Sequence, residues 1–174
     1  MVKIEIDQSG KWESHTCTAL GVDINGVAFS SRIEHSEKNL VLRSLGSFDQ
    51  LKNCSKKQRT IRLFSYTLFL TIRHILREED LVVIDKEYAE QDQQIRDILL
   101  YLFSKFNGLK INPKNIQFGQ VGKDCIAHRV ALQTFKGLRQ PERNPKMQDY
   151  FALLDKTAQI RLKALERRKR HLKS

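Results

Sequence analysis

The sequence predicts an α/β fold in which a mixed five-stranded sheet carries helices on both faces. Three observations support this class. The first third of the chain alternates short β-forming runs with turn residues. Residues 57–77 and 90–106 instead place apolar side chains at spacings of three and four, which is typical of amphipathic helices. Between these two segments, the strand expected over residues 81–85 begins with four apolar, mostly β-branched residues, which indicates burial on both faces.

Three strands are expected before the first helix. Residues 2–7 alternate apolar and polar side chains, and residues 14–22 and 27–33 are rich in β-forming residues. Asn25-Gly26 favours a tight hairpin between the last two. We expect residues 40–45 to form a further strand or a ragged extension. The start of the chain is therefore predicted to be an antiparallel meander.

The second half is predicted to finish the sheet and cover it. Residues 115–122 are expected to form the last strand and its exit turn. A helix over residues 123–135 follows, and its small Ala127 and Ala131 would let it lie close to the sheet. The first 138 residues would then make one domain.

The remaining residues, 139–174, are predicted to be an appendage. Residues 139–146 contain two prolines and have the composition of a linker. Residues 147–173 carry an apolar stripe at helical spacing, which predicts a last helix with a strongly basic end.

Carboxylates follow two of the predicted strands. Asp7 ends the first strand, Asp85 ends the buried strand at 81–85, and Glu87 comes two residues later. If these strands are parallel neighbours, the three acids converge at the carboxyl edge of the sheet, where ligands gather in open α/β sheets. Crowded carboxylates repel one another unless a divalent cation neutralises them. The alternative interpretation is a turn cap at Asp7 and a solvated helix start at Asp85 and Glu87.

The order of elements, and the segments Ile6-Asp7-Gln8-Ser9-Gly10-Lys11, Ile84-Asp85-Lys86-Glu87-Tyr88 and Gly122-Lys123-Asp124-Cys125-Ile126-Ala127-His128, resemble the ribonuclease H-like superfamily of nucleases, resolvases and integrases. The similarity covers roughly residues 2–135 and indicates a small, poorly characterised branch. It implies that the first and fourth strands are adjacent and parallel, and that Asp7 and Asp85 bind Mg²⁺ or Mn²⁺.

The chain departs from that family pattern in two places. Residues 56–77 contain no glutamate, although ribonuclease H has one in its first helix. Resolvase-like members carry two carboxylates on the last helix, whereas this chain offers Asp124 and His128. We therefore expect one well-held metal, with a second bound only when a phosphate bridges it.

Three polar residues near position 125 are further candidates for the site. Asp124 and His128 are four residues apart and would share a helical face, with Asp124 as a third metal ligand. His128 would protonate a leaving oxygen or hold a phosphate, and Lys123 would pair with a phosphate or an acid. The alternative is a capping aspartate and a packed histidine.

Positive charge is concentrated near the C-terminus. The net charge is +11, and residues 136–174 hold 12 Lys and Arg against 4 Asp and Glu. Such a segment suggests a polyanion such as DNA or RNA, although a solvated surface helix is also rich in Lys and Arg. The candidate nucleic-acid contacts are Lys11, Arg167, Arg168, Lys169 and Arg170.

Two other features allow two interpretations each. Lys56, Lys57, Arg59 and Arg62 make the start of the first predicted helix basic, against the helix dipole. They would serve an anionic partner or form an exposed cationic turn without a role. Trp12 would stack on a base or pack in the core.

The remaining composition excludes several classes of protein. Cys17, Cys54 and Cys125 are an odd, scattered set without metal spacing, so we expect reduced thiols in a cytoplasmic protein. The histidines show no zinc pattern. No apolar run is long enough to span a bilayer, and the first residues show no export signal.

Three functions remain open on the sequence alone. The first is a metal-dependent nuclease or strand-transfer enzyme that acts on DNA or RNA. The second is a non-catalytic nucleic-acid-binding protein on a degenerate form of the same fold. The third is a protein–protein adaptor, or a homodimer, that uses the apolar stripe of the C-terminal helix.

Overall fold

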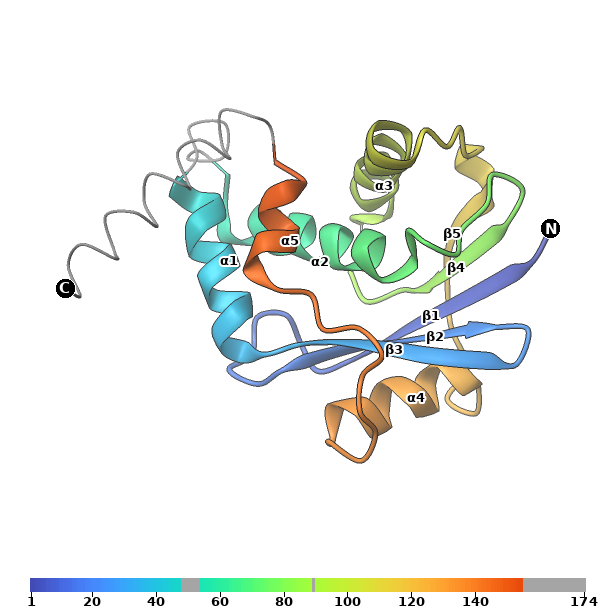
Figure 1. Cartoon of the computed structure of the whole chain (residues 1–174), viewed down its shortest axis with the longest axis horizontal. Coiled ribbons are helices and arrows are strands. Elements are labelled where there is room, and N and C mark those ends of the chain that lie inside the picture. The colour runs from blue at the N-terminus through green and yellow to red at the C-terminus, as the bar shows by residue number, and fades with distance from the viewer. Residues whose placement is uncertain (48–53, 89, 155–174) are drawn as a thin grey trace.

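The computed structural model describes residues 1–47, 54–88 and 90–154 and contains one five-stranded sheet (Figure 1). The strands lie in the order β3-β2-β1-β4-β5. β1 is antiparallel to β2 and parallel to β4, β2 is antiparallel to β3, and β4 is parallel to β5. The strands span Lys3–Ser9, Thr18–Ile24, Val27–Ile33, Leu81–Asp85 and Ile116–Gly119.

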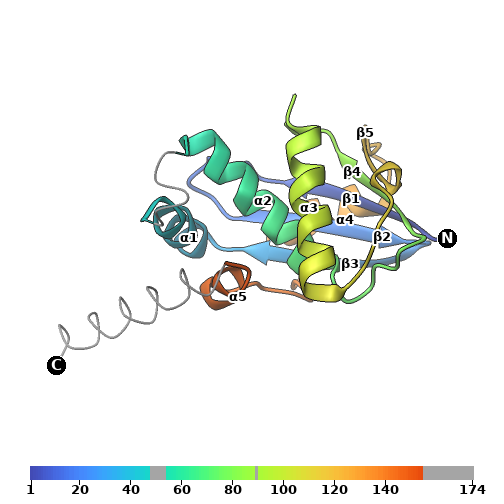
Figure 2. The same ribbon diagram turned by 90° about the horizontal axis from the view of Figure 1, so that it is seen from above.

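Helices cover both faces of this sheet (Figures 1 and 2). α1, α2, α3 and α5 lie on one face, and α4 lies on the other. Their bounds are His35–Ser47, Lys56–Ile72, Asp92–Asn107, Ile126–Phe135 and Met147–Ala152 for α1 to α5. The predicted α/β class, with a mixed five-stranded sheet between helices, is confirmed.

The prediction for residues 40–45 was wrong, because this segment belongs to α1. All three residues of the run Leu40-Val41-Leu42 are apolar. Such a run shows neither the period of a strand nor that of a helix, so the sequence alone does not distinguish the two. In the fold, Val41 and Leu45 are fully buried four residues apart, which is the spacing of one helical face.

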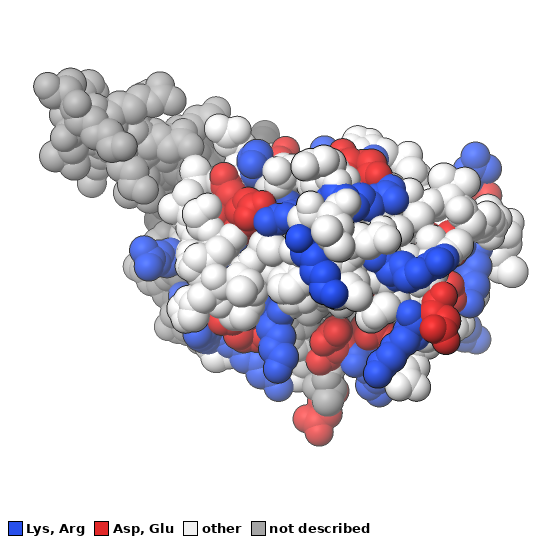
Figure 3. Space-filling model, turned by 90° about the horizontal axis from the view of Figure 1, so that it is seen from below, with Lys and Arg blue, Asp and Glu red and all other residues white. Residues whose placement is uncertain are grey.

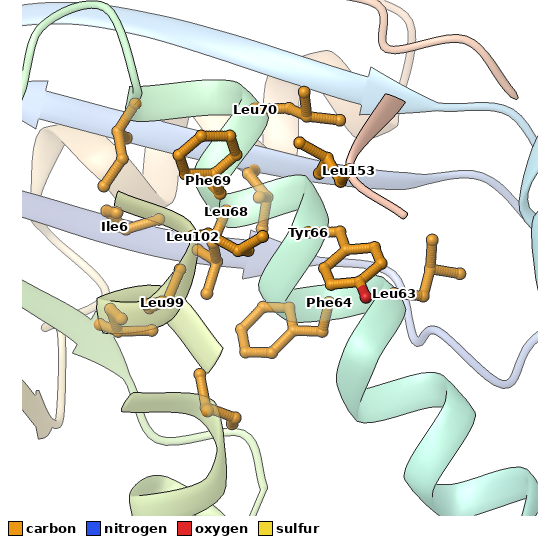
Figure 4. Close-up of a cluster of buried hydrophobic side chains, with 14 of the residues drawn as sticks. Ile6, Leu63, Phe64, Tyr66, Leu68, Phe69, Leu70, Leu99, Leu102 and Leu153 are labelled. Atoms are coloured by element: carbon orange, nitrogen blue, oxygen red, sulfur yellow. The ribbon is translucent and has the colours of Figure 1, made fainter. Parts of the chain in front are cut away.

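α2 is the central element of the core and is buried along most of its length (Figure 4). The sheet lies beneath it, and α1, α3 and α5 contact it from the sides and above. Four hydroxyls inside the helix satisfy their hydrogen bonds locally by donating to carbonyls four residues earlier: Thr60, Ser65, Thr67 and Thr71. An apolar helix surface is stable here because little of it meets water.

The segment predicted as a linker, 139–146, lies along the free edge of β3. Arg143 N donates to Ser30 O at 3.1 Å, and Arg32 N donates to Arg143 O at 3.0 Å. Glu142 Oε2 accepts from Ser30 N at 2.7 Å. The contact occupies backbone groups that an edge strand would otherwise expose.

Part of the predicted last helix is described. α5 covers its first residues, and the part of the prediction from residue 155 onward lies outside the described residues. Among the described helices, none combines the length and the hydrophobicity needed to cross a membrane.

Gly21 of β2 allows α4 to lie directly on the sheet. A Cβ at this position would be 2.1 Å from Ala127 O and 2.5 Å from Ala131 N. The two alanines are fully buried, so small side chains on the helix complete the close approach that their sequence pattern predicted. This contact fixes the height of α4 above β1 and β2.

We predict that Gly21→Ala destabilises the fold by about 1–3 kcal/mol, because the added methyl group must displace the α4 backbone. Urea unfolding measures the change. Gly122→Ala is the matched control, since no atom lies within 4 Å of a Cβ built there. Equal stabilities of the two variants would contradict the proposed packing constraint.

Candidate functional site

Asp7 and Asp85 lie next to each other at the carboxyl ends of two parallel strands. Ile6 of β1 is in register with Ile84 of β4, and each isoleucine is followed by one of these aspartates. The predicted convergence of the two acids is therefore confirmed. Parallel pairing determines it, since neighbouring residues at the same level of a parallel sheet point to the same face.

Asp7 is buried and paired with a histidine from α4. Its side chain is only 4% exposed, and His128 Nδ1 lies 3.1 Å from Asp7 Oδ2. Burial raises the pKa of Asp7 to about 6; His128 opposes this shift, whereas Asp85 and Glu87 add to it. When Nδ1 carries a proton, it donates to the carboxylate and favours the ionised form of Asp7.

Asp85 is held by the turn that follows β5. Its Oδ1 accepts a hydrogen bond of 2.7 Å from Val121 N. Among the described residues, no hydrogen-bond donor reaches Asp7 Oδ1 or Asp85 Oδ2. Each carboxylate thus has one oxygen fixed by the protein and one left for another ligand.

Glu87 and Lys11 stand at the rim of the acid pair. Glu87 N donates to Asp85 O at 3.0 Å, so a tight turn brings the glutamate back toward the strand end. Partial burial and the charge of Asp85 raise the pKa of Glu87, and the charge of Lys11 opposes this rise. The structure therefore brings both predicted residues to the same edge of the sheet.

Lys123 and Asp124 are placed differently from their prediction. α4 begins at Ile126, and its N-cap is Cys125, whose Sγ accepts from His128 N. Lys123 and Asp124 are exposed in the preceding turn, so Asp124 and His128 do not share a helical face. The helix predicted from residue 123 begins three residues later. A turn, in which Cys125 N donates to Gly122 O, precedes it.

Two further predicted contacts have different outcomes. Trp12 is 1% exposed, donates to Gln8 Oε1 and packs its ring 5.7 Å from that of Phe64, so it is a core residue. The basic segment Arg167-Arg168-Lys169-Arg170 lies outside the described residues.

The sequence interpretation missed Lys38 of α1. It is fully buried, and its ammonium donates to Lys11 O, Thr16 O and Thr18 Oγ1. Burial lowers the pKa of Lys38, and the charges of Cys17 and Glu13 oppose this effect. Lys38 lies three residues before Val41, on the same face of α1. Had α1 been predicted as a helix, a lysine on its buried face would have indicated a buried, hydrogen-bonded ammonium group.

The donor set suits a hard cation that keeps much of its own hydration. Within the described ranges, no three His, Cys, Asp or Glu side chains are grouped closely enough to hold a metal ion. Mg²⁺ commonly binds proteins through one or two carboxylates, and water and substrate phosphate supply the other ligands. The free oxygens of Asp7 and Asp85 fit that mode of binding.

Comparisons with protein-family models, curated proteins and solved structures found no match to this chain. What the site does is therefore inferred from its own residues.

The raised pKa of Asp7 predicts a pH-dependent stability. In the unfolded chain the carboxyl group titrates near 3.8, and in the fold near 6. The folded state therefore binds the proton more tightly, and stability falls as pH rises from about 4 through about 6. Asp7→Asn should remove this loss, which amounts to about 3 kcal/mol.

Urea unfolding in EDTA, at pH values from 4 to 8, measures this effect. The stability of Asp7→Asn relative to the parent chain should rise across this range. Asp124→Asn removes an exposed charge and is the control. A stability difference between Asp7→Asn and the parent that stays constant with pH would contradict the burial argument.

Proposed function

We propose that the chain is a metal-dependent nuclease or resolvase-like enzyme that hydrolyses phosphodiester bonds in DNA or RNA on a ribonuclease H-like fold. The observation that carries the proposal is the position of Asp7 and Asp85, in register at the ends of adjacent parallel strands. The strand order also supports it, because the first strand lies between the second and the fourth.

Asp7 Oδ1 and Asp85 Oδ2 would hold Mg²⁺ or Mn²⁺. When bound there, the ion would lower the pKa of a water molecule and neutralise charge on the phosphate. Val121 N fixes Asp85 and His128 fixes Asp7, so the two free oxygens are oriented before any ligand arrives.

His128 would act on the substrate through its second ring nitrogen. Nδ1 is engaged by Asp7, while the side chain as a whole is 31% exposed. Nε2 would then donate a proton to the leaving oxygen or bind a phosphate. The proposal assigns no role to Lys123 or Asp124, and it places Glu87 at the mouth of the site.

A non-catalytic nucleic-acid-binding protein on the same fold is the second candidate. Two observations favour it: His128 already occupies one oxygen of Asp7, and the described residues group no third metal ligand with the two aspartates. Such a protein would bind DNA or RNA in a salt-dependent way without metal-dependent turnover.

A cleavage assay separates the two candidates. Labelled DNA and RNA, as single strands, duplexes and junctions, are incubated with Mg²⁺ or Mn²⁺. Asp7→Asn and Asp85→Asn should each lower the rate by about 1,000-fold, because a bound metal contributes several kcal/mol to catalysis. Asp97→Asn, on the exposed surface of α3, is the control. Cleavage that survives both substitutions excludes the proposed site.

Metal binding gives a readout that does not depend on activity. Mn²⁺ at pH 7.5 should raise the Tm of the parent chain and leave that of the Asp7→Asn/Asp85→Asn double variant unchanged. An equal shift in both proteins would place the ion elsewhere.

A further inference from the structure

The loop between β1 and β2, residues 10–17, is held from inside by the buried ammonium of Lys38. Lys38 Nζ lies 3.1 Å from Lys11 O and 2.8 Å from Thr16 O, near the two ends of the loop. A third hydrogen bond of 3.2 Å reaches Thr18 Oγ1. All three ammonium protons therefore have acceptors, and the loop is fixed to α1 at both ends.

The same loop is also fixed to α2. The ring of Trp12 lies 5.7 Å from that of Phe64, and Tyr88, in the segment after β4, lies 5.4 Å from Phe64 on the same helix. Lys11 is therefore carried by a loop that is fixed to both helices, and its charge opposes the rise in the pKa of Glu87. Figure 2 shows the start of α2 near the carboxyl end of β1, on the sheet face opposite to α4, from which His128 reaches Asp7.

The start of α2 adds positive charge to this edge. Lys56 and Lys57 are exposed, Arg59 follows them, and the whole helix contains no acidic residue. No ion pair joins these three residues to any other described residue. Cations at the start of a helix oppose its dipole, so local electrostatics disfavour this arrangement.

The face covered by α4 has a different pattern of charge. Figure 3 shows blue and red side chains interspersed there, which leaves no continuous surface of one sign. Among the described residues, the cations of the loop and of the start of α2 form no ion pair, although Glu13 stands in the same loop as Lys11. We call Lys11, Lys56, Lys57 and Arg59 the basic rim.

We propose that the basic rim binds the phosphodiester backbone of the nucleic acid and leads it to Asp7 and Asp85. Lys38 is a positioning residue, because it holds the loop that carries Lys11. The direction of the strand toward the aspartates rests on the proposed function, whereas the backbone contact does not. Lysines recognise phosphate without reading bases, so the rim contributes affinity and not sequence preference.

The test compares two charge-matched triple variants. One is Lys11→Ala/Lys56→Ala/Lys57→Ala; the control is Arg77→Ala/Lys110→Ala/Lys114→Ala, whose exposed cations lie before β4 and β5, at the opposite edge. Fluorescence anisotropy measures binding of a labelled 20-nucleotide DNA and the matching RNA between about 50 and 200 mM salt.

The rim variant should bind at least about tenfold more weakly at the lowest salt, and its log–log salt slope should fall by about 2. The control variant should keep most of its affinity. Unchanged binding by the rim variant, or equal losses in both, overturns the proposal. The proposal is also overturned if the protein binds phosphatidylserine vesicles through the rim lysines and does not bind DNA or RNA.

Lys38→Met tests the positioning role. It should lower the salt slope by about 0.7, as loss of the Lys11 contact alone would, and Lys11→Ala should then add no further decrease. A further decrease in the double variant overturns that role. Because Lys38→Met removes a buried charge, Lys11→Ala alone still tests the contribution of Lys11 to the basic rim if Lys38→Met does not fold.

Failure of the rim is distinguishable from failure of the catalytic proposal. If the rim variant loses binding while Asp7→Asn and Asp85→Asn still cleave, the basic rim stands and the active site does not. If the aspartate variants lose cleavage while the rim variant binds normally, the basic rim is wrong and the active site stands.

Discussion

The structure depends on holding two carboxylates together that repel each other. The parallel register of β1 and β4 places Asp7 beside Asp85, and burial of Asp7 makes the repulsion stronger than it would be in water. Burial is the main cause that raises the pKa of Asp7 from 3.8 to about 6, and the charge of Asp85 adds to this rise. A buried carboxylate beside a second acid costs stability. Replacing one of the two by a neutral side chain, or exposing it to water, would make the fold more stable.

The surrounding elements reduce this repulsion from two directions. Gly21 pairs with Asp7 in the sheet and lies directly under α4, so the helix comes close enough for His128 to reach the buried acid. On the other side, the chain after β5 returns toward β4 and presents Val121 N to Asp85. One acid is stabilised by a helix on the sheet face and the other by a loop at the sheet edge. Neither contact occupies both oxygens of its carboxylate.

Local sequence patterns were enough to predict the sheet and the acid pair. Residues 81–85 and 27–33 have the composition of strands and form strands at those bounds. The convergence of Asp7 and Asp85 required one further assumption, that the two strands are parallel neighbours, and the register bears it out.

The errors came from places where tertiary contacts decide. Residues 40–45 have no clear period and became helical because Val41 and Leu45 are buried together. The start of α4 moved past Asp124 because a cysteine, which is rarely a helix cap, accepts the hydrogen bond at that end. Lys38 was missed because α1 was not predicted, and its three acceptors come from another segment of the chain.

The most direct test of the account is a crystal of this protein soaked in Mn²⁺ at a pH above 7 and measured for anomalous scattering. We expect a peak between the carboxylates of Asp7 and Asp85, with Val121 N still bound to Asp85. A crystal with no peak at that position, in which His128 and Asp7 remain paired and water fills the gap between the acids, would contradict it.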